Sequence, residues 1–218
     1  MKKNWLKFGL IALAAVVGLI LISNGLDRHA ANKIPKSPST YTIQADYNID
    51  VSDPQAVVGS GNYVFVGKVT ELTGTTYENK VPVERKDGSV EYIGSAYTQY
   101  QVQVLTNLKN ELITTAPIDL AKAGGIREDK TAYDLFENDT LPQKGKTYLF
   151  IAYAQQDGSL LVTGANSNIL LDDDASDTTS VAKIKTTAVY QKYTQAVAQQ
   201  KKDPDTEPRV SDYDVTQQ

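Results

Sequence analysis

The 218-residue chain contains no cysteine and a single histidine, His29. Without cysteine it has no disulfide scaffold, no thiolate zinc site, no cysteine nucleophile and no lipid-modified N-terminal cysteine. One histidine leaves little for acid–base catalysis or metal binding. His29 lies in a polar segment with no second ligand near it, so we expect a solvated side chain there.

Long runs of positive charge are also absent. The chain has 22 Lys and Arg residues against 26 Asp and Glu, a net charge of -4. This balance lacks the basic footprint that a phosphate backbone requires, so we expect no nucleic-acid partner. The hydrophobic share of 41% and the charged share of 22% are typical of a folded protein. The length allows one domain with accessory segments.

The longest apolar stretch lies near the N-terminus. Small or apolar residues run unbroken over Phe8–Ile22, and starting from Trp5 gives 18 residues, at the lower end for a bilayer-spanning helix. Lys2, Lys3 and Lys7 precede Phe8, which predicts a cytoplasmic N-terminus and an extracellular C-terminal domain. A single-pass protein in the cell membrane, anchored by Trp5–Ile22, follows from this interpretation.

A cleavable signal peptide shows the same basic start and apolar core, and that alternative stays open. We favour an uncleaved anchor, because the run is long for a signal peptide and no Ala-x-Ala triplet follows it. Both interpretations export the rest of the chain.

Composition divides the chain into segments. Residues 23–50 are polar, contain two prolines and show no periodicity, which indicates a stalk. Beyond Asp203 no apolar stripe remains. We therefore expect a transmembrane signal-anchor over 1–22, an extracellular stalk over 23–50, a β domain over 51–171, a C-terminal helix over 172–202 and a disordered tail over 203–218.

Strand patterns dominate the central segment. Residues 97–109 alternate between apolar side chains and glutamines, while 63–69 and 147–153 are apolar on both faces. Asp157-Gly158 is typical of a hairpin turn. About five strands over 62–171 predict a mainly β fold with flanking helices, either a small barrel or a sandwich. A short helix over 54–59 precedes it, with Ser52 or Asp53 as its cap.

The order of four motifs resembles exported bacterial proteins with an OB fold of the netrin/tissue-inhibitor-of-metalloproteinase type. These motifs are the strand Asn62–Val69, the strand Tyr97–Leu105 with Leu108-Lys109-Asn110, the pair Gly124-Gly125, and the segment Leu141–Leu149. The resemblance implies a five-stranded OB-like barrel over 51–171. Asn110 replaces a glycine of the family pattern, a change that asparagine tolerates at positive φ.

The layout of anchor, stalk and domain is similar to membrane-anchored surface proteins of Gram-positive bacteria. The inhibitory mechanism of the metalloproteinase inhibitors does not transfer, because it uses an N-terminal cysteine and this chain has none.

Carboxylates offer the remaining route to chemistry. Asp172–Asp177 imitates the start of a calcium loop, but Asp177 stands where that loop needs glycine and Lys183 where it needs glutamate. We expect no metal and no cofactor. Glu111, Asp119, Glu128 and Asp129 supply acids for hydrolysis, but the sequence does not pair them.

Three tyrosines in expected loops carry the functional hypothesis. Tyr77, Tyr92 and Tyr133 are amphipathic side chains of the type enriched in binding surfaces. They lie in the two long polar loops 74–95 and 126–145, through which we expect contact with an envelope protein or glycan. We thus expect a non-enzymatic binding or accessory module at the bacterial cell surface. The alternatives are a cell-wall or peptide hydrolase using unpaired carboxylates, or a regulatory subunit of a membrane complex.

Overall fold

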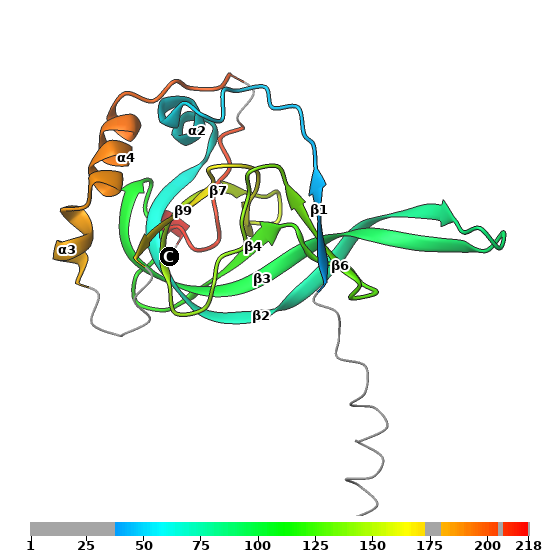
Figure 1. Ribbon diagram of the computed structural model, residues 1–218. Helices are drawn as coiled ribbons and strands as arrows, with labels where there is room; N and C mark the ends of the chain where they lie inside the picture. Colours follow the sequence, from blue (N-terminus) through cyan, green and yellow to red (C-terminus); the bar gives the residue numbers. More distant parts are fainter. Residues whose placement is uncertain (1–37, 173–179, 205–206, 218) are drawn as a thin grey trace, which may run out of the picture. The chain divides into compact units, whose positions relative to one another are not determined.

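The computed structural model describes residues 38–172, 180–204 and 207–217 (Figure 1). The expected anchor Trp5–Ile22, His29 and the acidic residues 173–177 lie outside this part of the chain. Within it, no helix is long and apolar enough to cross a bilayer. Residues Ser39–Gln218 form one compact unit, and this unit is described below.

This unit is mainly β with a few short helices. The strands are β1 (Ser39–Ile43), β2 (Tyr63–Glu84), β3 (Val90–Lys109), β4 (Ile118–Ala123), β5 (Gly125–Ile126), β6 (Ala132–Phe136), β7 (Thr147–Ala154), β8 (Leu160–Val162) and β9 (Asn168–Asp172). The helices are α2 (Pro54–Ser60), α3 (Val181–Lys185), α4 (Ala188–Ala198) and the 3-10 turn η1 (Val215–Gln217).

Five strands pair in a closed ring. The order β2-β3-β4-β8-β7 returns to β2, because β2 also pairs with β7 over Tyr63–Lys68. β4 and β8 run parallel, and the other pairs of the ring are antiparallel. β9 joins β7, while β1, β6 and β5 form a separate three-stranded sheet.

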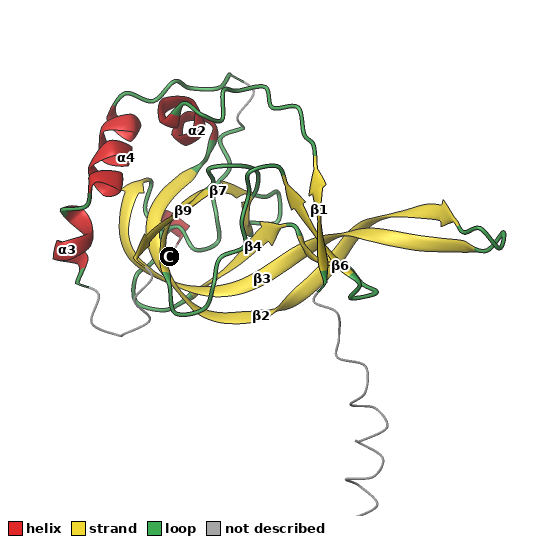
Figure 2. Cartoon of the chain, viewed as in Figure 1, coloured by secondary structure: helices red, strands yellow, loops and turns green. Residues whose placement is uncertain are grey.

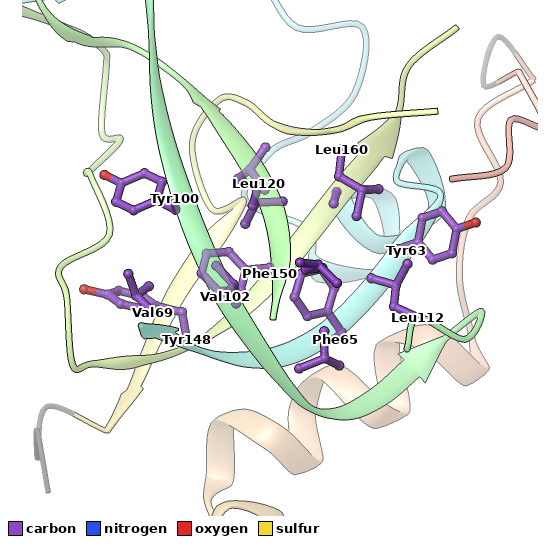
Figure 3. Packing of buried hydrophobic residues seen from close by; sticks show 14 of the residues in the cluster. Tyr63, Phe65, Val69, Tyr100, Val102, Leu112, Leu120, Tyr148, Phe150 and Leu160 are labelled. Carbon is purple, nitrogen blue, oxygen red and sulfur yellow. The ribbon is translucent and has the colours of Figure 1, made fainter. Parts of the chain in front are cut away.

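The core fills the inside of the ring (Figure 3). Tyr100, Val102 and Val104 on β3 are at most 2% exposed, whereas the glutamines between them remain partly exposed. The alternation predicted for this strand is therefore confirmed. Phe65 of β2 and Phe150 of β7 pack with ring centroids 5.4 Å apart, which joins the two strands that close the ring.

A second apolar layer lies between the ring and helices α2 and α4. Val58 of α2 and Tyr193 of α4 pack against Val64 and Ile151, which point outward from β2 and β7. The predicted helix over 54–59 is confirmed as α2, because the Asp53 side chain accepts the Gln55 N–H and proline occupies the first turn.

Asn110 has the positive φ, 53°, that its place at the end of β3 predicted. Its Nδ2 donates to the Asn62 carbonyl at 2.8 Å. The asparagine thus replaces glycine in this turn while making a bond that glycine cannot make.

Residues 74–95, expected as a loop, form a long hairpin arm that extends away from the ring (Figure 2). β2 and β3 pair without interruption by another element from Gly74 opposite Gln99 to Glu84 opposite Val90. The predicted turn at 86–89 is the tip, where Gly88 N–H donates to the Arg85 carbonyl. Most arm residues are exposed on both faces, so the sequence shows no alternation that would reveal a strand.

Two segments expected to lack regular structure contribute strands. The stalk prediction is wrong for Ser39–Ile43, which is β1 and pairs in parallel with β6. The expected loop 126–145 contains β6, Ala132–Phe136. All five residues of β1 are exposed. Such a strand shows no alternation of apolar and polar residues that would reveal it in the sequence.

The C-terminal region also differs from expectation. The predicted helix 172–202 is divided into α3 and α4, because Thr187 caps a new helix by accepting the Tyr190 N–H. The expectation of a disordered tail is wrong for residues 207–217. Ser211 and Asp214 are buried, and both bond to the Tyr63 hydroxyl at the start of β2.

Candidate functional site

The structure brings the two predicted loops together. Lys80 Nζ on the arm lies 3.2 Å from Glu128 Oε1 in the segment after β5. Gly125 packs so closely against Thr98 and Thr75 of the arm strands that a β-carbon there would collide with the Thr98 hydroxyl. The arm and the three-stranded sheet β1-β6-β5 therefore meet over a shared boundary.

A groove of about 280 Å³ lies at this boundary. Its apolar lining comes from Ile43 of β1, Val81 and Ile93 of the arm, and Phe136 of β6. Asp134 of β6 supplies a carboxylate at the same place. We call these five residues the arm groove.

The three predicted tyrosines lie around this region in different environments. Tyr92 stands on the arm opposite Pro82 and is 62% exposed. Tyr77 is half-buried on β2, and Tyr133 is half-buried on β6 between β1 and β5. Burial, with the nearby charges of Glu128 and Asp129, raises the pKa of Tyr77, so its hydroxyl stays protonated. Of the three tyrosines, only Tyr92 exposes most of its surface to solvent.

Arg127 fixes the sheet next to the groove. Its guanidinium binds the Asp134 carboxylate through Nε and Nη2 at 2.7–2.9 Å and lies 4.4 Å from the centre of the Tyr41 ring. The hydrogen bond to Asp134 raises the pKa of Arg127. One side chain thus connects β6 to the edge strand β1 by a paired fork and a cation–π contact.

β1 leaves one edge open. Among the described strands only β6 pairs with it, and its sequence Ser39–Ile43 has no charge or proline. Tyr41 is 55% and Ile43 39% exposed. Natural edge strands usually carry charges, prolines or bulges that prevent pairing with another chain. β1 is short but has none of these protections.

Three of the four candidate carboxylates bond to other side chains of the described residues, and none of these bonds joins two of the four. Asp119 accepts from Gln101 and from the Tyr213 hydroxyl, Glu128 pairs with Lys80, and Asp129 accepts from Thr131. Hydrogen bonds from Thr131 lower the pKa of Asp129. Glu111 lies in the turn after β3, where its carbonyl accepts the Val215 N–H. In the described part of the chain, no three His, Asp or Glu side chains are placed to hold a metal.

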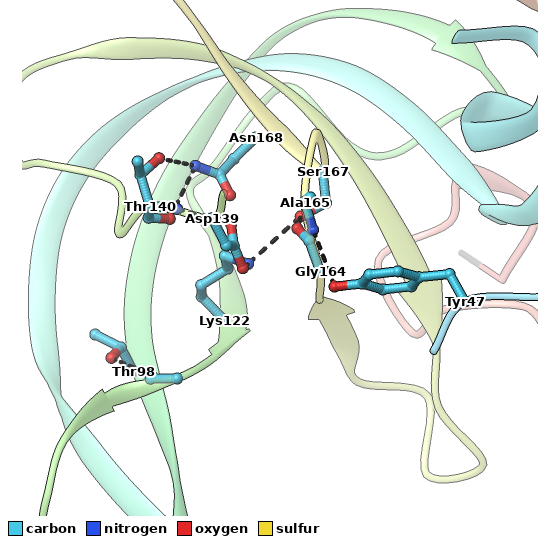
Figure 4. A network of polar contacts seen from close by, with 10 residues as sticks. Tyr47, Thr98, Lys122, Asp139, Thr140, Gly164, Ala165, Ser167 and Asn168 are labelled. Atoms are coloured by element: carbon cyan, nitrogen blue, oxygen red, sulfur yellow. Dashed lines mark hydrogen bonds and ion pairs between the residues drawn. The ribbon is translucent and has the colours of Figure 1, made fainter. Parts of the chain in front are cut away.

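A buried ion pair holds the second loop in place (Figure 4). Lys122 points inward from β4 and binds Asp139, which follows β6, with side chains 0% and 2% exposed. Lys122 Nζ also lies 3.4 Å from Ser167 Oγ. Burial lowers the pKa of Lys122 and raises that of Asp139. Neither residue was a predicted site residue, because single charges in a sequence do not indicate a buried partner.

A second cavity lies away from the arm groove and shares no lining residue with it. It measures about 510 Å³ and includes Tyr47, Ser60, Tyr153, Gln155 and Thr163 in its lining. Burial, with the nearby Asp203, raises the pKa of Tyr153. We call it the tyrosine cavity. Its walls come from segments more than 100 residues apart, so local sequence patterns gave no signal for it.

In comparisons with known proteins, no family model and no curated protein matches this chain.

Proposed function

We propose that this chain is a non-enzymatic binding or accessory module, anchored in the bacterial membrane by Trp5–Ile22 and exposed outside the cell. The proposed scaffold is an OB-like barrel. The closed order β2-β3-β4-β8-β7 supports it, since an OB fold is a five-stranded Greek-key barrel. In this proposal Lys122 and Asp139 fasten the 126–145 segment across one part of the ring.

The observation that carries the binding role is the arm groove beside an unprotected strand edge. The groove exposes apolar side chains, including Val81 at 57%. β1 lies next to it, and its outer edge pairs with no other strand of the described residues. An extended polypeptide binds such an edge through main-chain hydrogen bonds, while neighbouring pockets select its side chains. The proposed partner is therefore a protein segment in extended conformation, with an apolar side chain in the groove.

Site-specific photo-crosslinking on living cells tests this proposal. A photoreactive amino acid replaces Tyr41, Val81 or Tyr92 in the full chain, and crosslinked products are identified by mass spectrometry. We expect one common partner from all three positions. Asp157, in the exposed turn between β7 and β8, is the matched control position and should give no such product.

A second variant tests the β1 edge together with Ile43 of the arm groove. Tyr41→Lys with Ile43→Lys adds charges that disfavour pairing at an edge, and it should reduce the crosslink from Val81 at least about 5-fold, which corresponds to roughly 1 kcal/mol. Equal crosslinking from Asp157, or an unchanged yield in the double lysine variant with a normal melting temperature, would count against the proposal.

A further inference from the structure

The tyrosine cavity is lined by five separate parts of the fold. These are the segment before α2, α2 itself, the end of β7 with its turn into β8, the 163–167 loop, and the residues Asp203, Glu207 and Arg209. Its volume of about 510 Å³ falls within the roughly 300–1,000 Å³ of ordinary small-molecule sites. The space is thus large enough for a ligand of one or two sugar rings.

Hydrogen bonds between distant segments keep the cavity open. Asn62 Nδ2 donates to the Glu207 carbonyl, and Asn62 Oδ1 accepts the Ala154 N–H. Asn166 Nδ2 donates to the Val51 carbonyl. Walls fixed in this way need little ordering when a ligand enters, which reduces the entropic cost of binding.

Three side chains of the walls, Tyr47, Tyr153 and Gln155, keep a donor or an acceptor beyond the hydrogen bonds that they make to described residues. Ser60 Oγ donates to the Val57 carbonyl, so the Tyr153 hydroxyl is the donor in their 2.9 Å bond and its oxygen can accept another. Tyr47 accepts the Ala165 N–H and keeps its own proton for donation (Figure 4). Gln155 donates to the Tyr153 carbonyl, which leaves its side-chain oxygen available.

The charges around the cavity do not favour an anionic ligand. Asp203 and Glu207 lie at the cavity, and the lining cation Arg209 is paired with Glu207 through its Nη2 at 2.5 Å. An anion would meet these carboxylates without a free cation in the lining. Neutral hydroxyl and amide groups beside two tyrosine rings and the aliphatic Leu161 instead match a ligand that is polar at its edges and apolar on its faces.

We propose that the tyrosine cavity is a binding site for a neutral saccharide, whose hydroxyl groups bond to Tyr47, Tyr153 and Gln155 while a sugar face packs on the tyrosine rings. This site is independent of the arm groove. Variants of the arm that abolish crosslinking to a protein partner should bind the saccharide unchanged.

Calorimetric titration of the full chain tests the proposal, in a detergent that has no sugar headgroup. The probes are the tetrasaccharide of N-acetylglucosamine and maltotetraose, with a neutral tetrapeptide as the competing ligand class. We expect at least one saccharide to bind with Kd below about 1 mM, ordinary for a site of this size with few polar contacts, and no binding of the peptide.

Neighbouring residues supply matched variants. Gln155→Ala should weaken saccharide binding at least about 5-fold, while Gln156→Ala, one position along the same turn and outside the cavity, should leave it within about 2-fold. Thr163→Trp fills the cavity and should abolish binding. The melting temperature of each variant shows whether the fold is intact, and if Thr163→Trp fails to fold, the comparison of Gln155→Ala with Gln156→Ala decides.

Three results would overturn the proposal. They are the absence of saccharide binding to the wild type at about 10 mM, binding that survives Thr163→Trp in a folded protein, and peptide binding that Gln155→Ala weakens. None of them bears on crosslinking at the arm, so failure here is distinguishable from failure of the proposed protein-binding role.

Discussion

Lys122 and Asp139 form an ion pair inside the fold, with side chains 0% and 2% exposed. Removing one member leaves the other charge buried without its partner, which costs about 3–5 kcal/mol. We expect Asp139→Ala to lower the free energy of unfolding by that amount. Chemical denaturation measures it, with Asp157→Ala in the exposed turn as the control.

A paired replacement tests whether the unpaired buried charge causes this loss of stability. Lys122→Met with Asp139→Leu removes both charges and keeps similar volume, so we expect most of the lost stability to return. If the double variant is as unstable as Asp139→Ala, the uncompensated charge is not the cause of the loss.

Replacing Gly59 by alanine should lower stability, which is the opposite of the usual effect inside a helix. Inside a helix such as α2, glycine to alanine ordinarily stabilises by about 1 kcal/mol. A β-carbon at Gly59 would collide with the backbone carbonyl of Lys201, and that residue is held by its N–H bond to the Gln55 carbonyl at 3.0 Å. We therefore expect Gly59→Ala to destabilise by about 1–3 kcal/mol, in the range for overpacking.

Thermal unfolding of the full chain and of Gly59→Ala measures this effect. Gly88→Ala at the arm tip is an informative comparison, since its β-carbon would meet no neighbour and its cost comes only from a φ of +81°. An increase in the melting temperature of Gly59→Ala would contradict the packing of α2 against the segment after α4.

The raised pKa of Tyr63 predicts that the folded protein loses stability at alkaline pH. Burial first, and then its contact with Asp214, raise the pKa of Tyr63 to about 12. The folded protein keeps this proton up to about pH 12, while the unfolded chain releases it near the ordinary tyrosine value of 10.0. The folded state therefore binds more protons between these pH values, and stability falls as the pH rises through this window.

Tyr63→Phe should reduce that alkaline slope. Its cost at neutral pH should be about 1–2 kcal/mol, because the Asp214 carboxylate and Ser211 N–H lose their hydrogen-bond partner. Urea denaturation between pH 8 and 11 compares the two proteins. Identical slopes in wild type and variant would show that other groups determine the alkaline behaviour.

The two ion pairs near the arm groove should differ in strength. Lys80 and Glu128 have side chains 47% and 49% exposed, so Lys80→Ala should change stability by less than about 1 kcal/mol. Arg127→Ala removes a fork to Asp134 and the contact with Tyr41, and we expect a loss of about 1–2 kcal/mol. Hydrogen exchange should then show β1 opening faster only in Arg127→Ala.

Elements that bury one face were predictable from the sequence. Residues 97–109 alternate because β3 has a core side, and Asp53 with Pro54 marked the start of α2. The arm and β1 were not predictable, since their strands have solvent on both faces and leave no period in the sequence. Their pairing depends on backbone partners far along the chain.

The candidate site divides in the same way. The sequence indicated the two loops that contribute to the arm groove, because a long polar segment can be recognised from consecutive residues. It gave no sign of the tyrosine cavity, which needs Tyr47, Gln155 and Glu207 together. It also missed Asp214 in the expected tail, whose role depends on Tyr63, 151 positions away.

That last contact has a kinetic consequence. The pairing of β2 with β7 and the hydrogen bond between Tyr63 and Asp214 both join residues far apart in the chain. Small β proteins dominated by such long-range contacts fold in milliseconds to seconds. During this time β1 and the arm strands present open backbone. We expect this unit to fold more slowly than a helical protein of equal size.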